Sequence, residues 1–413
     1  MDQPNAPQPD TETLLLTALE DASKSFPARA LRALDAAAEL PTRVRKIPWQ
    51  DRLTAPVATA LSAWGGPFTA HDKYLITLDN GRKSFGVGTA AAALADGVLS
   101  GTSPASVLQR LKDAFANNRA TGQGVMALRG ITISQPIEFS NRISLVPIAD
   151  LPDSRNKTNI LQDEGTPAHV LFPATCALTV PLEISPLFYP LDSSPPDQKE
   201  PLQLQNLLDD ARLALTLVGP SVPVSAGYWF QFDDPVLAHI GSGSLFLRRG
   251  IRDPWRLFHP TALDAAEAVR TVDAFLALRD PLRSRIRLSL SRLFDALGEF
   301  PGGDRALDLA IALESLLVEG SNEITYRLAL RAALITETDP ALRVQLRALI
   351  TALYGVRSSL IHNGEVAPVR VKGRGKVPAV EIVEEASQAC AKILRAVLLR
   401  GELPDWETFE VSP

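Results

Sequence analysis

Apolar residues recur at helical spacing between Thr11 and Leu40, which predicts two helices divided by Phe26-Pro27. Three prolines then predict a loop-rich section, at Pro41, Pro48 and Pro56. We therefore expect a helical N-terminal segment over residues 1–70.

After about Lys73 the pattern changes to the alternation typical of β-strands. Asp79-Asn80-Gly81 is a turn signal between two short strands, 73–78 and 84–88. β-branched runs parted by Gly, Pro and Asn predict further strands at 124–128, 131–134, 137–139, 143–147, 169–189, 222–232 and 240–247. Among them lie predicted helices at 89–99, 104–116 and 202–218, a polar loop at 150–167 and a Pro-rich linker at 191–201.

The aromatic run Tyr228-Trp229-Phe230-Gln231-Phe232 belongs to one of these strands. Its pattern is that of a packed core strand. The alternative is a platform on which a ligand or RNA bases stack.

From about Pro260 the strand signals almost vanish and helical periodicity continues to the C-terminus. Helices are predicted at 261–278, 280–298, 304–319, 322–336, 339–361 and 378–400. Short loops between consecutive helices favour an up-and-down bundle. The predicted fold class is α+β, with a mixed α+β domain at 71–250 followed by an all-α helical bundle at 256–402.

Composition narrows the function classes. The 413-residue length favours two or three domains, and 46% hydrophobic with 22% charged residues is ordinary for a soluble globular protein. The net charge of −5 means that any RNA-binding surface must be local. We find no phosphate-binding loop of the G-x-x-x-x-G-K-[ST] type, so an ATP-using enzyme has little support.

Residue types also indicate the compartment. Two cysteines far apart in sequence, Cys176 and Cys390, exclude a disulfide framework and fit a reducing cytoplasm. No apolar run is long enough to span a bilayer, and the start of the chain lacks the pattern of a signal peptide. The five histidines have no local metal-binding spacing, so no metal or other cofactor is predicted.

Two charged residues interrupt apolar stripes of the predicted bundle. Glu314 lies in the stripe of the 304–319 helix, and Arg331 lies in that of the following helix. A lone buried charge is costly, so we expect these two residues to pair across neighbouring helices, to lie beside an active site, or both.

The segment Leu353–Gly364 joins Arg357, four spacers and His362 at the end of the 339–361 helix. The core seam of that helix is predicted to be Leu342, Leu346, Leu349, Leu353, Val356 and Leu360. Five positions turn an ideal helix by about 140°, so the helix must loosen near Asn363-Gly364 for Arg357 and His362 to reach one cleft. An arginine and a titrating histidine suit phosphodiester chemistry, in which one steadies phosphate charge and the other moves a proton. A surface arginine and a helix-capping histidine are the alternative.

Three ordered motifs carry a family resemblance: Ala310–Leu317 (AIALESLL), Glu323–Ala332 (EITYRLALRA) and Leu353–Gly364 (LYGVRSSLIHNG). Together they resemble the ApeA-like branch of the HEPN superfamily over roughly the last 150 residues. A weaker match precedes them, at 211–235.

The resemblance implies a helical bundle that forms a homodimer, with Arg-x4-6-His motifs converging at the dimer cleft as a metal-independent endoribonuclease site. It implies that Arg357 and His362 are the catalytic pair and that Ser358 assists. Many members of the superfamily carry Asn, Asp or His at the position of Ser358. The accessory polar positions would be Glu314, Arg331, Tyr354 and Asn363. Many such proteins act in antiviral defence, as toxins or in abortive infection, and by analogy a phage component is the expected trigger.

An RNA substrate requires a basic surface, and the sequence offers two candidates. One is a row on the 280–298 helix and its lead-in, Arg279, Arg283 and Arg287, which also fits a solvated helix face. The other is a Gly-containing loop after His362, with Arg370, Lys372, Arg374 and Lys376. The competing hypothesis is a HEPN module without catalysis that dimerises and binds RNA, a nucleotide or a protein.

Overall fold

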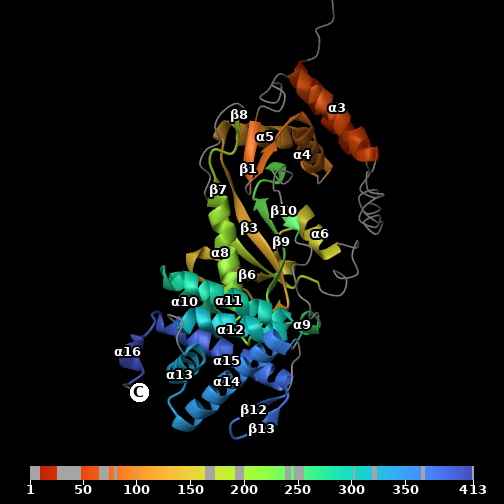
Figure 1. The fold of residues 1–413 in the computed structure, drawn as a ribbon. Helices are drawn as coiled ribbons and strands as arrows, with labels where there is room; N and C mark the ends of the chain where they lie inside the picture. The colour runs from red at the N-terminus through yellow and green to blue at the C-terminus, as the bar shows by residue number, and fades with distance from the viewer. Residues whose placement is uncertain are drawn as a thin grey trace, which may run out of the picture.

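The computed structural model describes, of the 413 residues, the ranges 10–25, 48–64, 74–78, 81–99, 101–162, 173–190, 200–237, 243–245, 255–300, 303–318, 323–363 and 368–411. Figure 1 shows the main sheet in the middle of the molecule, N-terminal helices above it and the C-terminal helices below it. The predicted α+β class is confirmed. The predicted second helix at 27–40 and most of the predicted linker lie outside the described residues.

The main sheet has six strands in the order β10-β9-β3-β7-β6-β5, and every neighbouring pair is antiparallel. In chain order the strands are β3 (Ala120–Arg129), β5 (Ile137–Glu138), β6 (Ser144–Pro147), β7 (Cys176–Ile184), β9 (Val224–Phe232) and β10 (Gly243–Leu245). Strands β3 and β9 approach closely at Gly122, where a Cβ atom would lie 2.2 Å from the carbonyl oxygen of Gln231. Only glycine fits at that position.

Both faces of the sheet are covered. On one face α8 (Glu200–Leu215) packs on β7 and β3. On the other a small core forms around Trp229, Val125 and Ala127, and α6 (Arg155–Gln162) contacts β9 there. Tyr228, Trp229 and Phe230 are each 1% exposed, so the aromatic run is a core strand and not an accessible stacking platform.

The described helices of the N-terminal end are α1 (Thr11–Ser25), α3 (Pro48–Trp64), α4 (Val87–Leu99) and α5 (Pro104–Asn117). The prediction of a loop-rich section up to Pro56 is wrong, because Pro56 lies inside α3. A proline inside a helix costs about 3 kcal/mol. Val57 and Leu61 are fully buried, and we infer that their burial offsets much of that cost.

Smaller strands complete this half of the molecule. A three-stranded sheet has the order β2-β1-β8, formed by β1 (Tyr74–Leu78), β2 (Gly81–Ser84) and β8 (Tyr189–Pro190). The predicted antiparallel pairing of two short strands is confirmed, but the predicted return strand at 84–88 is wrong, because β2 ends at Ser84 and α4 begins at Val87. The predicted polar loop at 150–167 is wrong in part, because it contains α6.

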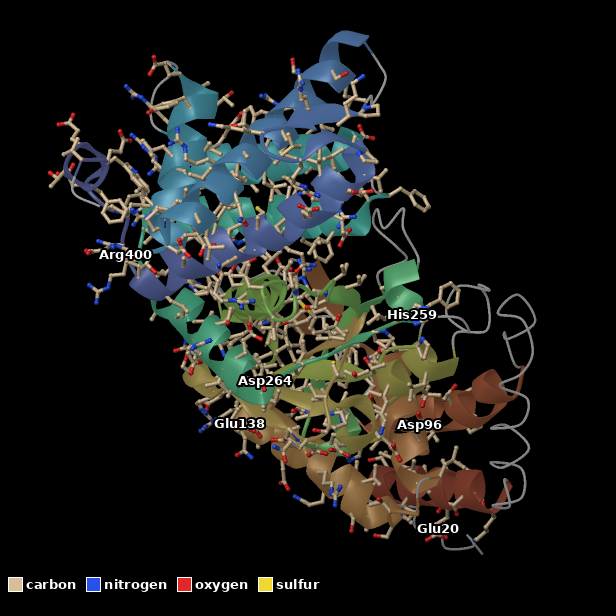
Figure 2. All side chains as sticks on the ribbon, turned by 90° about the horizontal axis from the view of Figure 1, so that it is seen from below. Glu20, Asp96, Glu138, His259, Asp264 and Arg400 are labelled. Carbon is tan, nitrogen blue, oxygen red and sulfur yellow. The ribbon has the colours of Figure 1, made fainter. Side chains whose placement is uncertain are left out.

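The lead-in to the bundle also differs from the prediction. Thr261 does not open a helix; it belongs to β11 (Thr261–Ala262), which pairs in parallel with β4 (Ile131–Thr132) after the short helix α9 (Trp255–Phe258). The helix α10 (Ala265–Ala277) begins after Asp264, whose Oδ1 accepts a hydrogen bond from the Glu267 amide at 2.7 Å. Figure 2 labels Asp264, at the start of α10, and Glu138 of β5, and α10 and β5 are in contact.

The bundle follows the predicted order of helices. They are α10, α11 (Leu282–Gly298), α12 (Gly303–Leu317), α13 (Ile324–Thr336), α14 (Pro340–Asn363), α15 (Ala379–Arg400) and the short α16 (Trp406–Phe409). The closest pairs are α11 with α12 and α13 with α14, while α15 contacts α10 to α14. The bundle is not entirely helical, because β12 (Val369–Val371) and β13 (Gly375–Val377) form a hairpin where the sequence indicated a loop. No helix in the described ranges is long and apolar enough to cross a membrane.

Candidate functional site

Arg357 of α14 pairs with Glu314 of α12. The Nη1 atom of Arg357 lies 3.2 Å from Oε1 of Glu314. The two side chains are 30% and 27% exposed, so a ligand reaches the pair from the surface. The two residues meet because α12 and α14 pack together, with Glu314 in the apolar stripe of α12 and Arg357 next to Val356 of the α14 seam.

Tyr354, one turn before Arg357 on α14, completes the cluster. Its hydroxyl donates a 2.6 Å hydrogen bond to Oε1 of Glu314, and its ring lies 5.5 Å from the Arg357 guanidinium carbon. Burial raises the pKa of the Tyr354 phenol, and Glu314 raises it further. The hydroxyl therefore stays protonated and remains a donor to Glu314.

The expected pairing of Glu314 with Arg331 is wrong. Arg331 donates from Nε to Glu410 at 2.6 Å and from Nη1 to the Leu317 carbonyl at 2.7 Å. Its guanidinium also lies over the Trp406 ring. Arg331 thus ties the end of α12 to the C-terminal α16, and its contacts in the described structure are structural ones.

The remaining members of the predicted catalytic motif lie further along α14. Ser358 is exposed. The helix continues through Asn363, so it ends where Asn363-Gly364 predicts. The side chains of His362 and Asn363 lie outside the described part of the structure. Because the helix is unbroken, the backbone positions of Arg357 and His362 lie about 140° apart around its axis.

The predicted basic loop forms the β12–β13 hairpin. Arg370 is directly opposite Lys376, and Val369, Val371 and Val377 alternate with them on the other face. A Cβ at Gly355 of α14 would lie 3.2 Å from Val369 Cγ1, so the apolar face of the hairpin rests on α14. The cations therefore face solvent, and Arg370, Lys372 and Lys376 form no ion pair with a described residue.

Arg374, in the turn of this hairpin, has a partner. Its Nη1 and Nη2 atoms donate to the two carboxylate oxygens of Glu385 on α15, at 2.6 and 2.8 Å. The hydrogen bonds from Arg374 lower the pKa of Glu385. No sequence pattern singles out Glu385, because its contact with Arg374 depends on the hairpin folding back over α15.

The arginine row of α11 faces the sheet domain. Arg283 donates to Asp210 of α8 at 2.7 Å, and Arg287 donates to Asp210 at 2.6 Å and to Asp209 at 2.9 Å. Arg279 is exposed at the lead-in to α11. The RNA-binding role of this row stays a prediction, and two of its three members already bind carboxylates.

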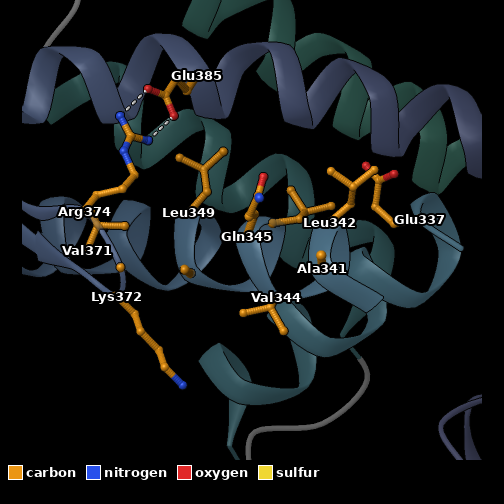
Figure 3. Close-up of a pocket in the computed structure, with 13 residues that line it drawn as sticks. Glu337, Ala341, Leu342, Val344, Gln345, Leu349, Val371, Lys372, Arg374 and Glu385 are labelled. Carbon is orange, nitrogen blue, oxygen red and sulfur yellow. Dashed lines mark hydrogen bonds and ion pairs between the residues drawn. The ribbon is translucent and has the colours of Figure 1, made fainter. Parts of the chain in front are cut away.

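A groove lies between the first half of α14 and the turn of the hairpin (Figure 3). Its volume is about 840 Å³. The helical periodicity placed Leu342 in the core seam, but Leu342 is 43% exposed and lines this groove. Sequence reasoning missed the groove, because the apolar positions of one helix do not show how much of that helix the neighbouring elements cover.

The chain matches no family model, no curated protein and no solved structure. No cluster of three or more His, Cys, Asp or Glu able to hold a metal ion occurs among the described residues. The resemblance to ApeA-like HEPN proteins therefore rests on the three sequence motifs and stays a prediction.

Proposed function

We propose that the protein is a metal-independent endoribonuclease of the HEPN type, with Arg357 and His362 as its catalytic pair. The observation that carries the proposal is the Glu314–Tyr354–Arg357 cluster. It holds a half-exposed arginine in a fixed position on the helix that also carries His362, beside a hairpin with outward-facing cations.

In the proposed reaction the RNA 2′-OH attacks the adjacent phosphorus. A 2′,3′-cyclic phosphate forms, the bond to the 5′ oxygen breaks, and that oxygen takes up a proton. His362 acts as general acid or base, and Arg357 stabilises the charge that develops on the phosphate oxygens. Glu314 and Tyr354 are positioning residues, since they fix the guanidinium before the substrate arrives.

Homodimerisation completes the proposed site. On an unbroken helix, the positions of Arg357 and His362 lie about 140° apart around the axis. In a two-fold cleft each chain contributes to both copies of the site, so the two residues of one site need not lie on the same face of one helix. The α+β domain would sense a trigger, with a phage component as the expected one, and defence by abortive infection is the proposed setting.

The test is cleavage of a mixed RNA pool by the purified protein in EDTA, beside Arg357→Ala and His362→Ala. Arg119→Ala is the matched control, because Arg119 also pairs with a surface glutamate, Glu183, at 2.7 Å but lies in the sheet domain. Cleavage by the wild type and the control, lost in both site variants that still fold, supports the proposal. Cleavage of matched DNA, which lacks the 2′-OH, contradicts the mechanism.

A second candidate is a HEPN module without catalysis that dimerises and binds RNA, a nucleotide or a protein. The observation that favours it is the ion pair itself, because Arg357 already has a carboxylate partner. RNA binding without cleavage, both alone and in phage-infected extract, favours this candidate. Glu314→Gln separates the two: it lowers cleavage if the pair positions Arg357 in a nuclease, whereas a module without catalysis shows no cleavage in the wild type or in this variant.

A further inference from the structure

The groove beside the hairpin combines aliphatic walls with selected polar groups. Leu342, Val344 and Leu349 of α14 supply apolar surface, and Leu342 and Val344 are 43% and 56% exposed. Gln345 lies among them, with an amide that both donates and accepts hydrogen bonds. A volume of about 840 Å³ lies within the range of small-ligand pockets.

The planar guanidinium group of Arg374 forms part of the groove wall. Its bidentate pair with Glu385 fixes the guanidinium plane and neutralises its charge locally, as the dashed lines in Figure 3 mark. Guanidinium planes are among the surfaces on which proteins stack single-stranded RNA bases. A fixed plane loses little conformational entropy when a base stacks on it.

Cations adjoin the groove. Lys372 lines it, next to Arg374 in the hairpin turn, and Arg370 and Lys376 face each other across the two strands. Like charges directly opposite in a hairpin are destabilising, so this arrangement favours an anion between or above them. Successive phosphate groups of a single RNA strand form ion pairs with three neighbouring cations.

We propose that this groove binds one base of a single-stranded RNA, stacked on Arg374, while Arg370, Lys372 and Lys376 bind the adjoining phosphates. The inference rests on the proposed function, because it takes RNA as the substrate. Leu349 and Arg357 are eight positions apart on α14, about 12 Å along its axis. A few nucleotides span that distance, so the groove sets which phosphate reaches Arg357.

The polar groups favour RNA over an apolar peptide as the occupant. A peptide helix would use the aliphatic residues, but it would leave the fixed guanidinium plane and the opposed cations without a role. A nucleotide uses the aliphatic wall, the plane, the amide of Gln345 and the cations together.

The test is fluorescence anisotropy with two labelled decamers of equal charge, 2′-O-methyl oligouridylate and its abasic counterpart. Neither has a free 2′-OH, so both report binding alone and the result does not depend on cleavage. We expect Arg374→Lys and Gln345→Ala to weaken binding of the uridylate decamer about tenfold and to leave the abasic decamer unaffected. Lys372→Ala should weaken both.

Leu288→Ser is the matched control for Leu342→Ser, since Leu288 is 46% exposed on α11, away from the groove. Only the Leu342 variant should lose affinity for the uridylate decamer, and circular dichroism verifies that each variant folds. Equal losses for both decamers in the Arg374 and Gln345 variants, or no loss in them, would overturn the inference and leave a protein partner as the occupant. Base-dependent binding without any cleavage would support the groove as a base-binding site and contradict the proposed nuclease activity.

Discussion

Two arginine-rich regions of the bundle resemble each other in sequence but differ in the structure. The row on α11 binds carboxylates of α8, and Asp210 accepts from both Arg283 and Arg287. The hairpin turns Arg370 and Lys376 to solvent, opposite each other and without a described counter-charge. The first row joins α11 to α8, the helix that covers the sheet, whereas the second leaves positive charge for a partner.

The difference shows that basic residues at regular spacing do not identify a nucleic-acid surface by themselves. What decides is whether acidic residues of another element lie within reach. On α11 those acids come from more than 70 positions earlier in the chain, at Asp209 and Asp210. On the hairpin, Arg374 is the cation that has such a partner among the described residues, Glu385.

The contrast between the α11 row and the hairpin is tested most strongly by substituting Asp210. Asp210 is 6% exposed and both of its carboxylate oxygens accept from arginine. We expect Asp210→Asn to lower the free energy of unfolding by about 2 kcal/mol, because two charge-assisted hydrogen bonds weaken while the partly exposed arginines regain water. Urea denaturation monitored by circular dichroism measures the change.

Glu20→Gln is the matched control for this prediction. Glu20 pairs with Lys24 at 3.6 Å, but their side chains are 57% and 72% exposed. An exposed i,i+4 pair contributes about 0.3–0.5 kcal/mol. Equal losses in the two variants would mean that the α8–α11 ion pairs add nothing beyond an ordinary surface pair.

The hairpin should show the opposite behaviour. Arg370→Ala combined with Lys376→Ala should not lower stability, because it removes two like charges that face each other. It should reduce the slope of log affinity against log salt for single-stranded RNA by about 1.4, or about 0.7 for each lost phosphate contact. Anisotropy titrations between about 50 and 300 mM salt measure the slope.

Arg283→Ala is the reciprocal control. It should lower stability, because Asp210 loses a donor, and leave the salt slope for RNA unchanged. A reduced slope in this variant would return the α11 row to the RNA-binding surface, and an unchanged slope in the hairpin double variant would remove the hairpin from it.

Periodicity and turn signals predicted most of the elements, because apolar spacing reflects which face each element buries. They failed where tertiary packing outweighed local preference: Pro56 lies inside α3, and residues 369–377 pair as a hairpin. At the site, the sequence singled out Glu314 and Arg357 but joined Glu314 to the wrong arginine. The axial register of neighbouring helices decides such pairs, and a single sequence does not contain it.

Carboxylates near the α11 row should give a smaller, pH-dependent effect. Burial raises the pKa of Asp295, and the neighbouring Asp308 raises it further. A raised pKa means that the charged form is disfavoured in the folded protein, so its cost is present above the raised pKa and fades as the pH falls toward the ordinary value of 3.8. Asp295→Asn should therefore raise the thermal midpoint at pH 7 and not near pH 4. A midpoint gain independent of pH would contradict this cause.

The smallest expected effect concerns Arg374 of the hairpin, which pairs with Glu385 of α15. Hydrogen bonds from Arg374 lower the pKa of Glu385, so the pair stabilises the fold above the ordinary glutamate pKa of 4.5 and loses that contribution as the pH falls through the lowered pKa. Both side chains are more than 40% exposed, so Glu385→Gln should shift the thermal midpoint only slightly at pH 7. The shift should vanish in strong acid, where wild-type Glu385 is itself protonated. A difference that persists at low pH would show that the glutamine perturbs packing, and the hairpin would then no longer contrast with α11 by charge alone.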